Sequence, residues 1–188
     1  MPGLVWLKIA FVPWIVHWLT IDNHSLSTLV KLGIPLLLGA LLWGYRRTFG
    51  RPTWMETGTP VYFALAGLVT LLGNGFFTTY GDVVDSLVLS GMWMGTLATS
   101  MPLTGDYSKW HYHPALWANH VFIKTNAIIT AVWGGIYLLQ AVMALAGHFA
   151  PAQAFQWMLA RHMLLIPAIV FTIWFHKWYP TYGFVKSR

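Results

Sequence analysis

The chain has 188 residues, of which 57% are hydrophobic and only 9% are charged. Apolar runs of membrane-spanning length recur along it, and their connections are too short for a soluble catalytic or nucleotide-binding fold, so we expect an integral membrane protein. The sequence contains no cysteine, which excludes disulfides, thiolate metal sites and a catalytic thiol. The net charge of +6 comes from Lys and Arg in short connections, and we interpret it as a topology signal rather than as a surface for nucleic acid.

The first apolar segment, residues 4–21, is barely long enough to span a membrane and contains Lys8, Pro13 and His17. It could therefore span, tilt or lie in the membrane interface. Because it lacks a small-residue cleavage site, we expect it to be retained rather than removed as a signal peptide.

The other apolar segments are long enough to span a bilayer. We expect helices over residues 26–45, 57–73, 83–101, 117–147 and 153–177. Basic clusters follow the second, fourth and sixth helices of the chain, so all of them lie on one side if each helix spans, and that side should be cytoplasmic. The sequence thus predicts a single all-α domain, a polytopic bundle of about six hydrophobic helices with both termini in the cytoplasm.

Two features predict how these helices pack. Gly91 and Gly95 form a small-xxx-small pattern on the fourth helix, which favours close packing within the bundle, with a homodimer contact as the alternative. One face of the fifth helix carries Asn126, Thr130, Trp133, Tyr137 and Gln140, which recur at steps of three and four residues. Polar side chains in hydrocarbon seek partners, so this face is expected to hold helices together or to line a cavity or substrate path.

Arg161 lies about two turns inside the last helix, where an unpaired charge costs about 2.5–3.5 kcal/mol. Asp82 and Asp85, at the same-side end of the fourth helix, are the best candidates for its counter-ion. Each could also serve its own helix, Asp82 as the N-cap and Asp85 in the first turn. Glu56 is expected at the opposite membrane face.

Several short motifs, in order along most of the chain, resemble the intracellular septation protein A family and related bacterial membrane proteins. They are the segments Phe11-Val12-Pro13-Trp14, Tyr45-Arg46-Arg47, Trp117 with Thr125-Asn126, Trp133-Gly134, and Trp174-Phe175-His176-Lys177. The resemblance implies a bacterial inner-membrane protein that supports septation and the cell envelope by contacting division and wall-synthesis proteins, with no enzymatic activity or cofactor. The connection 106–113 departs from the family pattern and leaves those partners open.

Eight histidines offer a second interpretation, because imidazole ligates haem iron and other metals. His162 and His176 are fourteen residues apart on one expected helix, but the pair of histidines that two stacked haems would need on a partner helix is missing. A single haem b or metal site near the cytoplasmic face could instead pair His176 with His120, His111 or His113. A site on the opposite face could use the residues His17, Asp22, His24 and His148.

A small-molecule transporter is the third interpretation, favoured by short loops and inward polar residues, although matched halves with broken helices are absent. An enzyme is not expected, since no catalytic constellation is present at a membrane face. The sequence therefore predicts a non-enzymatic protein without a cofactor that acts by association with other integral membrane proteins in the bilayer.

Overall fold

The computed structural model describes residues 3–21, 23 and 25–186, and these ranges form helices and short connections without a strand. The predicted all-α class is confirmed. The chain divides into two compact units, Met1–Gly81 (unit 1) and Asp82–Arg188 (unit 2). Within the described residues, three segments are long and apolar enough to cross a membrane, namely Thr28–Arg47, His120–Phe149 and Pro151–Tyr179. The expected count of six spans stays a prediction.

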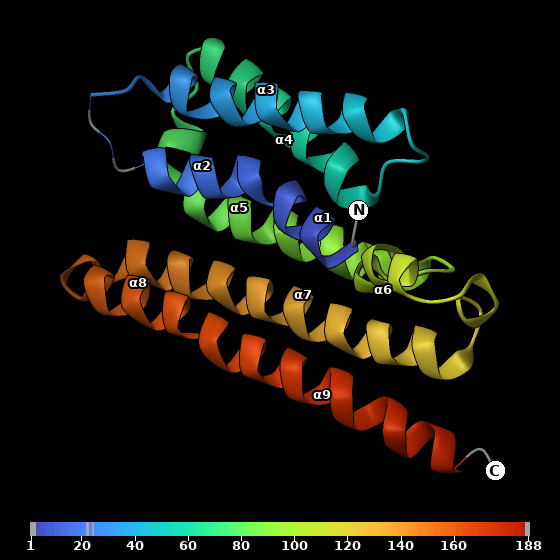
Figure 1. The fold of residues 1–188 in the computed structure, drawn as a ribbon. Helices are drawn as coiled ribbons and strands as arrows, with labels where there is room; N and C mark the ends of the chain where they lie inside the picture. Colours follow the sequence, from blue (N-terminus) through green and yellow to red (C-terminus); the bar gives the residue numbers. More distant parts are fainter. Residues whose placement is uncertain (1–2, 22, 24, 187–188) are drawn as a thin grey trace. The chain divides into compact units, whose positions relative to one another are not determined.

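Unit 1 is built from four helices and the first turn of a fifth (Figure 1). Their bounds are α1 Gly3–Ala10, α2 Val12–Ile21, α3 Thr28–Arg47, α4 Trp54–Leu71 and α5 Phe76–Gly95. The backbones of α3 and α4 approach closely, since a Cβ built on Gly39 would lie 3.3 Å from Pro60 Cδ. The fully buried Trp14 of α2 stacks on Tyr62 with ring centroids 5.2 Å apart and donates a 2.8 Å hydrogen bond to Thr59 Oγ1.

The first apolar segment is two helices rather than the single helix expected over 4–21. Its break falls at Phe11, whose N–H is shared between the carbonyls of Leu7 and Lys8 at 3.2 Å each. Pro13, two residues later, has no N–H for the carbonyl four residues before it, and its ring disfavours a straight helix. Pro13 is thus the physical cause of the break.

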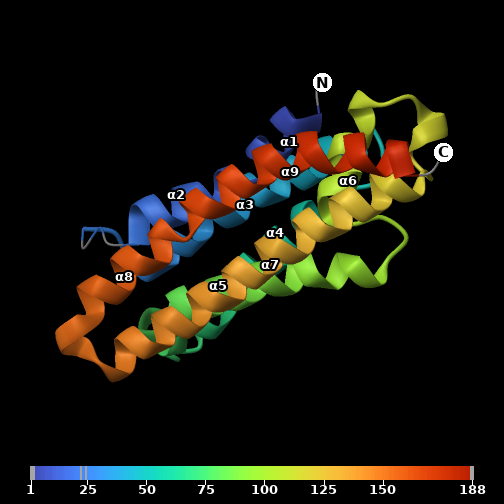
Figure 2. The same ribbon diagram turned by 90° about the horizontal axis from the view of Figure 1, so that it is seen from below.

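Unit 2 contains the rest of α5 and four further α-helices arranged around α7 (Figures 1 and 2). Their bounds are α6 Leu103–Ser108, α7 His120–Phe149, α8 Ala154–Met163 and α9 Leu165–Lys186, with 3-10 turns at Thr96–Ala98, Lys109–His111, Pro114–Leu116 and Pro151–Gln153. Buried Val83 of α5 packs with Ala141 and Ala144 of α7. Trp133 Nε1 of α7 donates to Thr172 Oγ1 of α9 at 2.9 Å. Because α8 and α9 turn back after α7, α9 lies antiparallel to it.

The structure changes two expected helix boundaries in unit 2. The helix expected over 153–177 is divided at Leu164 into α8 and α9, because Pro167 cannot donate to the carbonyl four residues before it. The helix expected over 83–101 begins at Phe76, bends at Tyr80 (φ −116°, ψ 16°) and ends at Gly95. This bend lies beside Gly81 and determines where Asp82 points.

Candidate functional site

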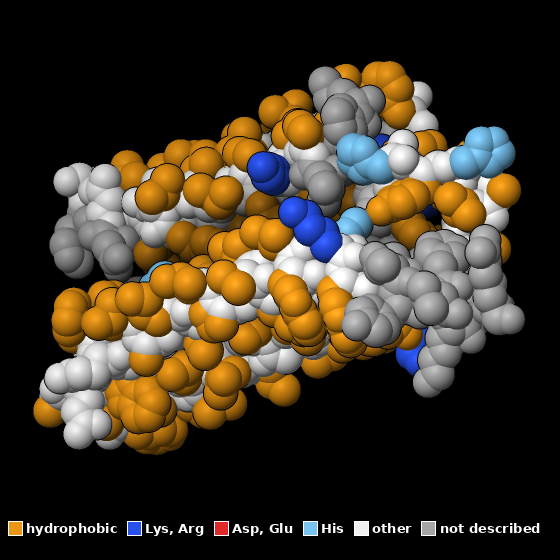
Figure 3. All heavy atoms as spheres, turned by 60° about the horizontal axis from the view of Figure 1, so that its bottom comes forward, with side chains coloured by type: hydrophobic (Ala, Val, Ile, Leu, Met, Phe, Trp, Pro, Cys, Tyr) orange, Lys and Arg blue, Asp and Glu red, His pale blue; other side chains and the backbone are white. Residues whose placement is uncertain are grey.

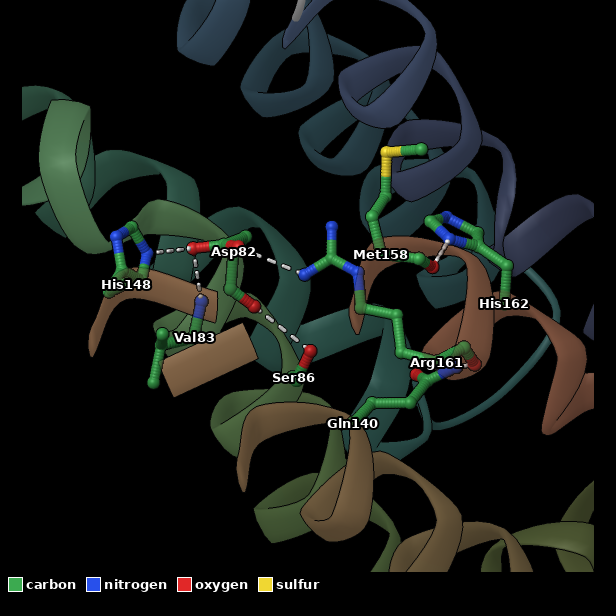
Figure 4. Close-up of polar contacts among 8 residues, drawn as sticks. All are labelled: Asp82, Val83, Ser86, Gln140, His148, Met158, Arg161 and His162. Atoms are coloured by element: carbon green, nitrogen blue, oxygen red, sulfur yellow. Dashed lines mark hydrogen bonds and ion pairs between the residues drawn. The ribbon is translucent and has the colours of Figure 1, made fainter. Parts of the chain in front are cut away.

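A charged cluster forms where α5, α7 and α8 meet in unit 2 (Figure 4). Arg161 of α8 donates from Nη1 to Asp82 Oδ2 of α5 at 2.9 Å. His148, near the end of α7, places Nε2 3.0 Å from Asp82 Oδ1. One carboxylate therefore faces two groups from two other helices, and Arg161 has the counter-ion that its depth in an apolar helix requires.

The two aspartates proposed as partners of Arg161 have different places in the structure. Asp82 makes the ion pair, whereas Asp85 lies one turn further along α5 with only 2% of its surface exposed. Asp82 is not the N-cap of its helix, because α5 begins at Phe76. The bend at Tyr80 nevertheless gives it a similar local role, since Asp82 Oδ1 accepts the N–H of Val83 at 2.9 Å. Asp82 therefore combines local capping with pairing.

Short hydrogen bonds hold the backbone around this cluster in place. Gln140 of α7 donates from Nε2 to the carbonyl of Arg161 at 2.8 Å. Ser86 donates to the carbonyl of Asp82 at 2.9 Å, one turn along α5. The side chains of the ion pair remain partly open, with 21% of Arg161 and 30% of Asp82 exposed. The backbone around the cluster is thus held in place, while water or a ligand can reach the charged side chains.

A second, uncharged polar network joins α6 to α7. Asn126 Oδ1 accepts from Ser108 Oγ at 3.1 Å, and the Asn126 carbonyl accepts from Thr104 Oγ1 at 2.9 Å. Thr130 Oγ1 lies 2.9 Å from Thr104 Oγ1 and accepts the Thr104 N–H at 3.2 Å. Asn126 and Thr130 are both buried, at 4% and 0% exposure. Asn126, Thr130 and Gln140 of the predicted polar face of α7 are thus each hydrogen-bonded to a neighbouring helix.

Gly91 and Gly95 of α5 have open space beside them. A Cβ built on either glycine would meet no atom of the described chain within 4 Å. By contrast, Ser90 donates to the Gly134 carbonyl of α7 at 2.9 Å, and Trp93 stacks on Trp133 with ring centroids 5.7 Å apart. The small-residue pattern therefore does not serve the α5–α7 contact, and both glycines are exposed.

The histidines of the haem interpretation do not share one helix, since His162 is on α8 and His176 is on α9. That premise was wrong because the helix breaks at Leu164. His162 is exposed and its Nδ1 lies 2.7 Å from the Met158 carbonyl, while His120 is exposed at the start of α7. Within the described ranges, no three His, Cys, Asp or Glu side chains are grouped so that they could hold a metal ion.

The histidine site considered on the opposite face is only partly described, because Asp22 and His24 lie outside the described residues. Of its other members, His17 is buried in unit 1, with Nδ1 3.1 Å from the Lys31 carbonyl. His148 belongs to the charged cluster of unit 2. Of the two histidines in that set that the structure describes, His148 lies beside the carboxylate of Asp82.

Sequence reasoning missed the role of Glu56 in unit 1. This carboxylate is 1% exposed and accepts hydrogen bonds from Trp6 Nε1 and from the Thr53 N–H at 2.8 Å. It also forms an ion pair with Arg46, whose Nε is 3.5 Å from Glu56 Oε2. Thr53 in turn accepts the Glu56 N–H at 3.4 Å, which completes a capping box at the start of α4. The pattern Thr53-Trp54-Met55-Glu56 is the usual sequence signature of such a box and could have revealed it.

No family model matches the chain, and no curated protein or solved structure shows significant similarity to it. The resemblance to the septation protein A family therefore stays a prediction. We infer function from the contacts described above.

Proposed function

We propose that this chain is an integral protein of the bacterial inner membrane that acts without catalysis, by associating with other membrane proteins. Three helical segments with the length and apolar composition of membrane spans support the membrane location. The resemblance of its motifs to the septation protein A family makes division and wall-synthesis proteins the candidate partners.

The observation that carries the proposal is the use of the polar face of α7. Asn126, Thr130 and Gln140 each form hydrogen bonds to α6 or α8. Polar groups that line a substrate path must stay available to the substrate, whereas groups that hold helices together are satisfied by protein. The contacts of α7 are those of interhelical packing, which favours association over passage through the bundle.

The uncovered glycines of α5 offer a surface for such association. Gly91 and Gly95 are one turn apart and exposed, so the backbone of another membrane helix can approach α5 closely there. A helix of a partner protein fits this surface, and a second copy of the chain is the alternative occupant.

Affinity co-purification from native membranes tests this proposal. A Gly91→Leu/Gly95→Leu variant should lose a partner that the wild type retains in near-stoichiometric amount. Gly33→Leu is the matched control, because Gly33 is also a helical glycine with open space around it, and it should retain the partner. If the wild type recovers no partner, or if both variants retain it equally, association through α5 is wrong.

A transporter is the second candidate, and the charged cluster favours it. Asp82, His148 and Arg161 combine exchangeable partners with 30%, 31% and 21% side-chain exposure, as a site that binds and releases a proton or ion would need. Proteoliposomes containing the wild type would then show proton or ion flux that Asp82→Asn abolishes. Equal flux in protein-free vesicles and in wild-type vesicles would dismiss this function.

A further inference from the structure

The outward face of α9 has a shallow groove with a distinctive order of side chains. Its lining residues are Val170, Ile173, Trp174, Lys177 and Trp178. Their spacing of three and four residues places them on one side of the helix. The apolar members are open, with 60% of Val170, 57% of Ile173 and 52% of Trp174 exposed.

The opposite face of α9 is the one that packs within unit 2. Ala168 and Phe175 are buried at 2% and 6% exposure, and Thr172 between them accepts from Trp133 of α7. The groove therefore faces away from α7. Figure 3 shows how widely hydrophobic side chains cover this side of the molecule, so an apolar occupant would extend an already apolar surface.

Along the helix axis, the side chains that line the groove change from aliphatic to aromatic to cationic. This order matches the acyl chain, ester region and phosphate of a phospholipid. Aliphatic Val170 and Ile173 come first, the stacked indoles of Trp174 and Trp178 follow with centroids 5.1 Å apart, and Lys177 brings an ammonium group. Seven residues of helix advance about 10 Å from Val170 to Lys177. Acyl chain, ester region and phosphate follow the same order over a similar depth, with Trp at the ester level and Lys reaching the phosphate.

Charge at this end of unit 2 favours an anion. The antiparallel packing of α7 and α9 brings the start of α7, with exposed Lys124, toward the end of α9 that bears Lys177. Asp106 of α6 is paired with Lys109, so this pair adds no net charge. Asp82 lies at the other end of unit 2, in the charged cluster. A lysine near the surface attracts anionic lipid by a factor of about five.

We propose that the α9 groove binds one anionic phospholipid, its phosphate on Lys177, its ester region against Trp174 and Trp178, and an acyl chain along Ile173 and Val170. This inference rests on the proposed membrane location but not on any partner protein. The ammonium group of Lys177 supplies three donors for phosphate oxygens and selects a net negative headgroup over a zwitterionic one.

Native mass spectrometry of the full chain in a mild detergent tests the site, with phosphatidylglycerol and phosphatidylcholine of identical acyl chains added in turn. The wild type should retain one phosphatidylglycerol in preference to phosphatidylcholine. Lys177→Gln should lower its occupancy about fivefold, Lys177→Arg should keep it, and Trp178→Leu should lower it as well. Lys124→Gln, a matched loss of charge outside the groove, should change it little.

Three outcomes would overturn the site: equal retention of both lipids, unchanged occupancy in Lys177→Gln, or an equal loss in Lys124→Gln. Glycerol phosphate at the same concentration should not compete, and competition by it would assign Lys177 to free phosphate rather than to lipid. Size-exclusion profiles of the variants check that they fold. Recovery of the wild-type chain in the membrane pellet tests the membrane location separately, so a failed lipid site and a failed location are distinguishable.

Discussion

Glu56 of unit 1 and Asp82 of unit 2 are carboxylates that each face a cation from another helix, and the two are held in different ways. Glu56 of unit 1 is 1% exposed and is fixed by an indole and a backbone N–H, with Arg46 at 3.5 Å. Asp82 of unit 2 is 30% exposed and is bound by Arg161 at 2.9 Å and His148 at 3.0 Å. The first carboxylate is enclosed by neutral donors, and the second is shared by two ionisable groups that remain partly open.

This difference in burial and partners indicates a structural role for Glu56 and a functional role for Asp82. A buried carboxylate whose oxygens are all engaged cannot change partner without disrupting its helix, so Glu56 is best understood as a structural lock at the start of α4. Asp82 can exchange one partner for another, or for water, while its backbone stays fixed by Ser86. Asp82 is therefore the carboxylate where function is to be sought.

The largest loss of stability should come from removing the Glu56 carboxylate. Glu56→Ala removes the acceptor of Trp6 and Thr53 and the carboxylate that faces Arg46, so the variant should be destabilised by about 3 kcal/mol, or roughly 6–12 °C in melting temperature. Thr53→Ala, which removes only the reciprocal cap, should cost about 1 kcal/mol. Thermal unfolding in detergent measures both. Equal melting of Glu56→Ala and the wild type would show that the lock contributes nothing.

A smaller effect is expected at the exposed pair. Arg161→Ala and Asp82→Asn each strand one charge in an apolar setting, so the double variant should cost less than the sum of the two by about 0.5–2 kcal/mol. A double-mutant cycle of melting measurements provides this coupling energy. The same cycle with Asp85→Asn in place of Asp82→Asn should be closer to additive, and strict additivity with Asp82 would mean that Arg161 reaches water instead.

The smallest effect concerns the histidine. His148→Gln keeps a donor near Asp82 but removes the group that can become charged, and with 31% of its side chain exposed it should lower stability by less than about 1 kcal/mol. Thermal unfolding in detergent measures this loss. A loss well above about 1 kcal/mol would show that the contact between His148 and Asp82 is needed to hold α7 on α5.

Much of the helical fold could be predicted from the sequence, because apolar runs of sufficient length fix where helices lie. Breaks at Phe11 and Leu164 were harder, since a proline can either bend or divide a helix and the choice depends on tertiary packing. The six-residue helix α6 was missed because its mixed sequence has no clear period. Because α6 was not predicted, the hydrogen-bond partners of Asn126 and Thr130 could not be predicted either.

The charged cluster was predictable only in part. An arginine inside an apolar helix requires a partner, and this argument led to Asp82 and Asp85. The choice between them depends on the bend at Tyr80, which rotates the following turn of α5 and has no distinctive sequence signature beyond Gly81. His148 was noted only as a metal ligand candidate. Its contact with Asp82 follows from the packing of α5 on α7, which no local pattern encodes.

The most direct test of the account is whether the polar face of α7 holds the bundle together. Asn126→Leu and Gln140→Leu should each lower the free energy of unfolding by about 0.6–1.7 kcal/mol, seen as a lower melting temperature in detergent, and should reduce partner recovery only in step with the folded fraction. Thr70→Val, whose hydroxyl bonds the Ala66 carbonyl of its own helix at 2.8 Å, should melt like the wild type. Unchanged melting of both Leu variants, together with complete loss of partner or activity, would contradict the account.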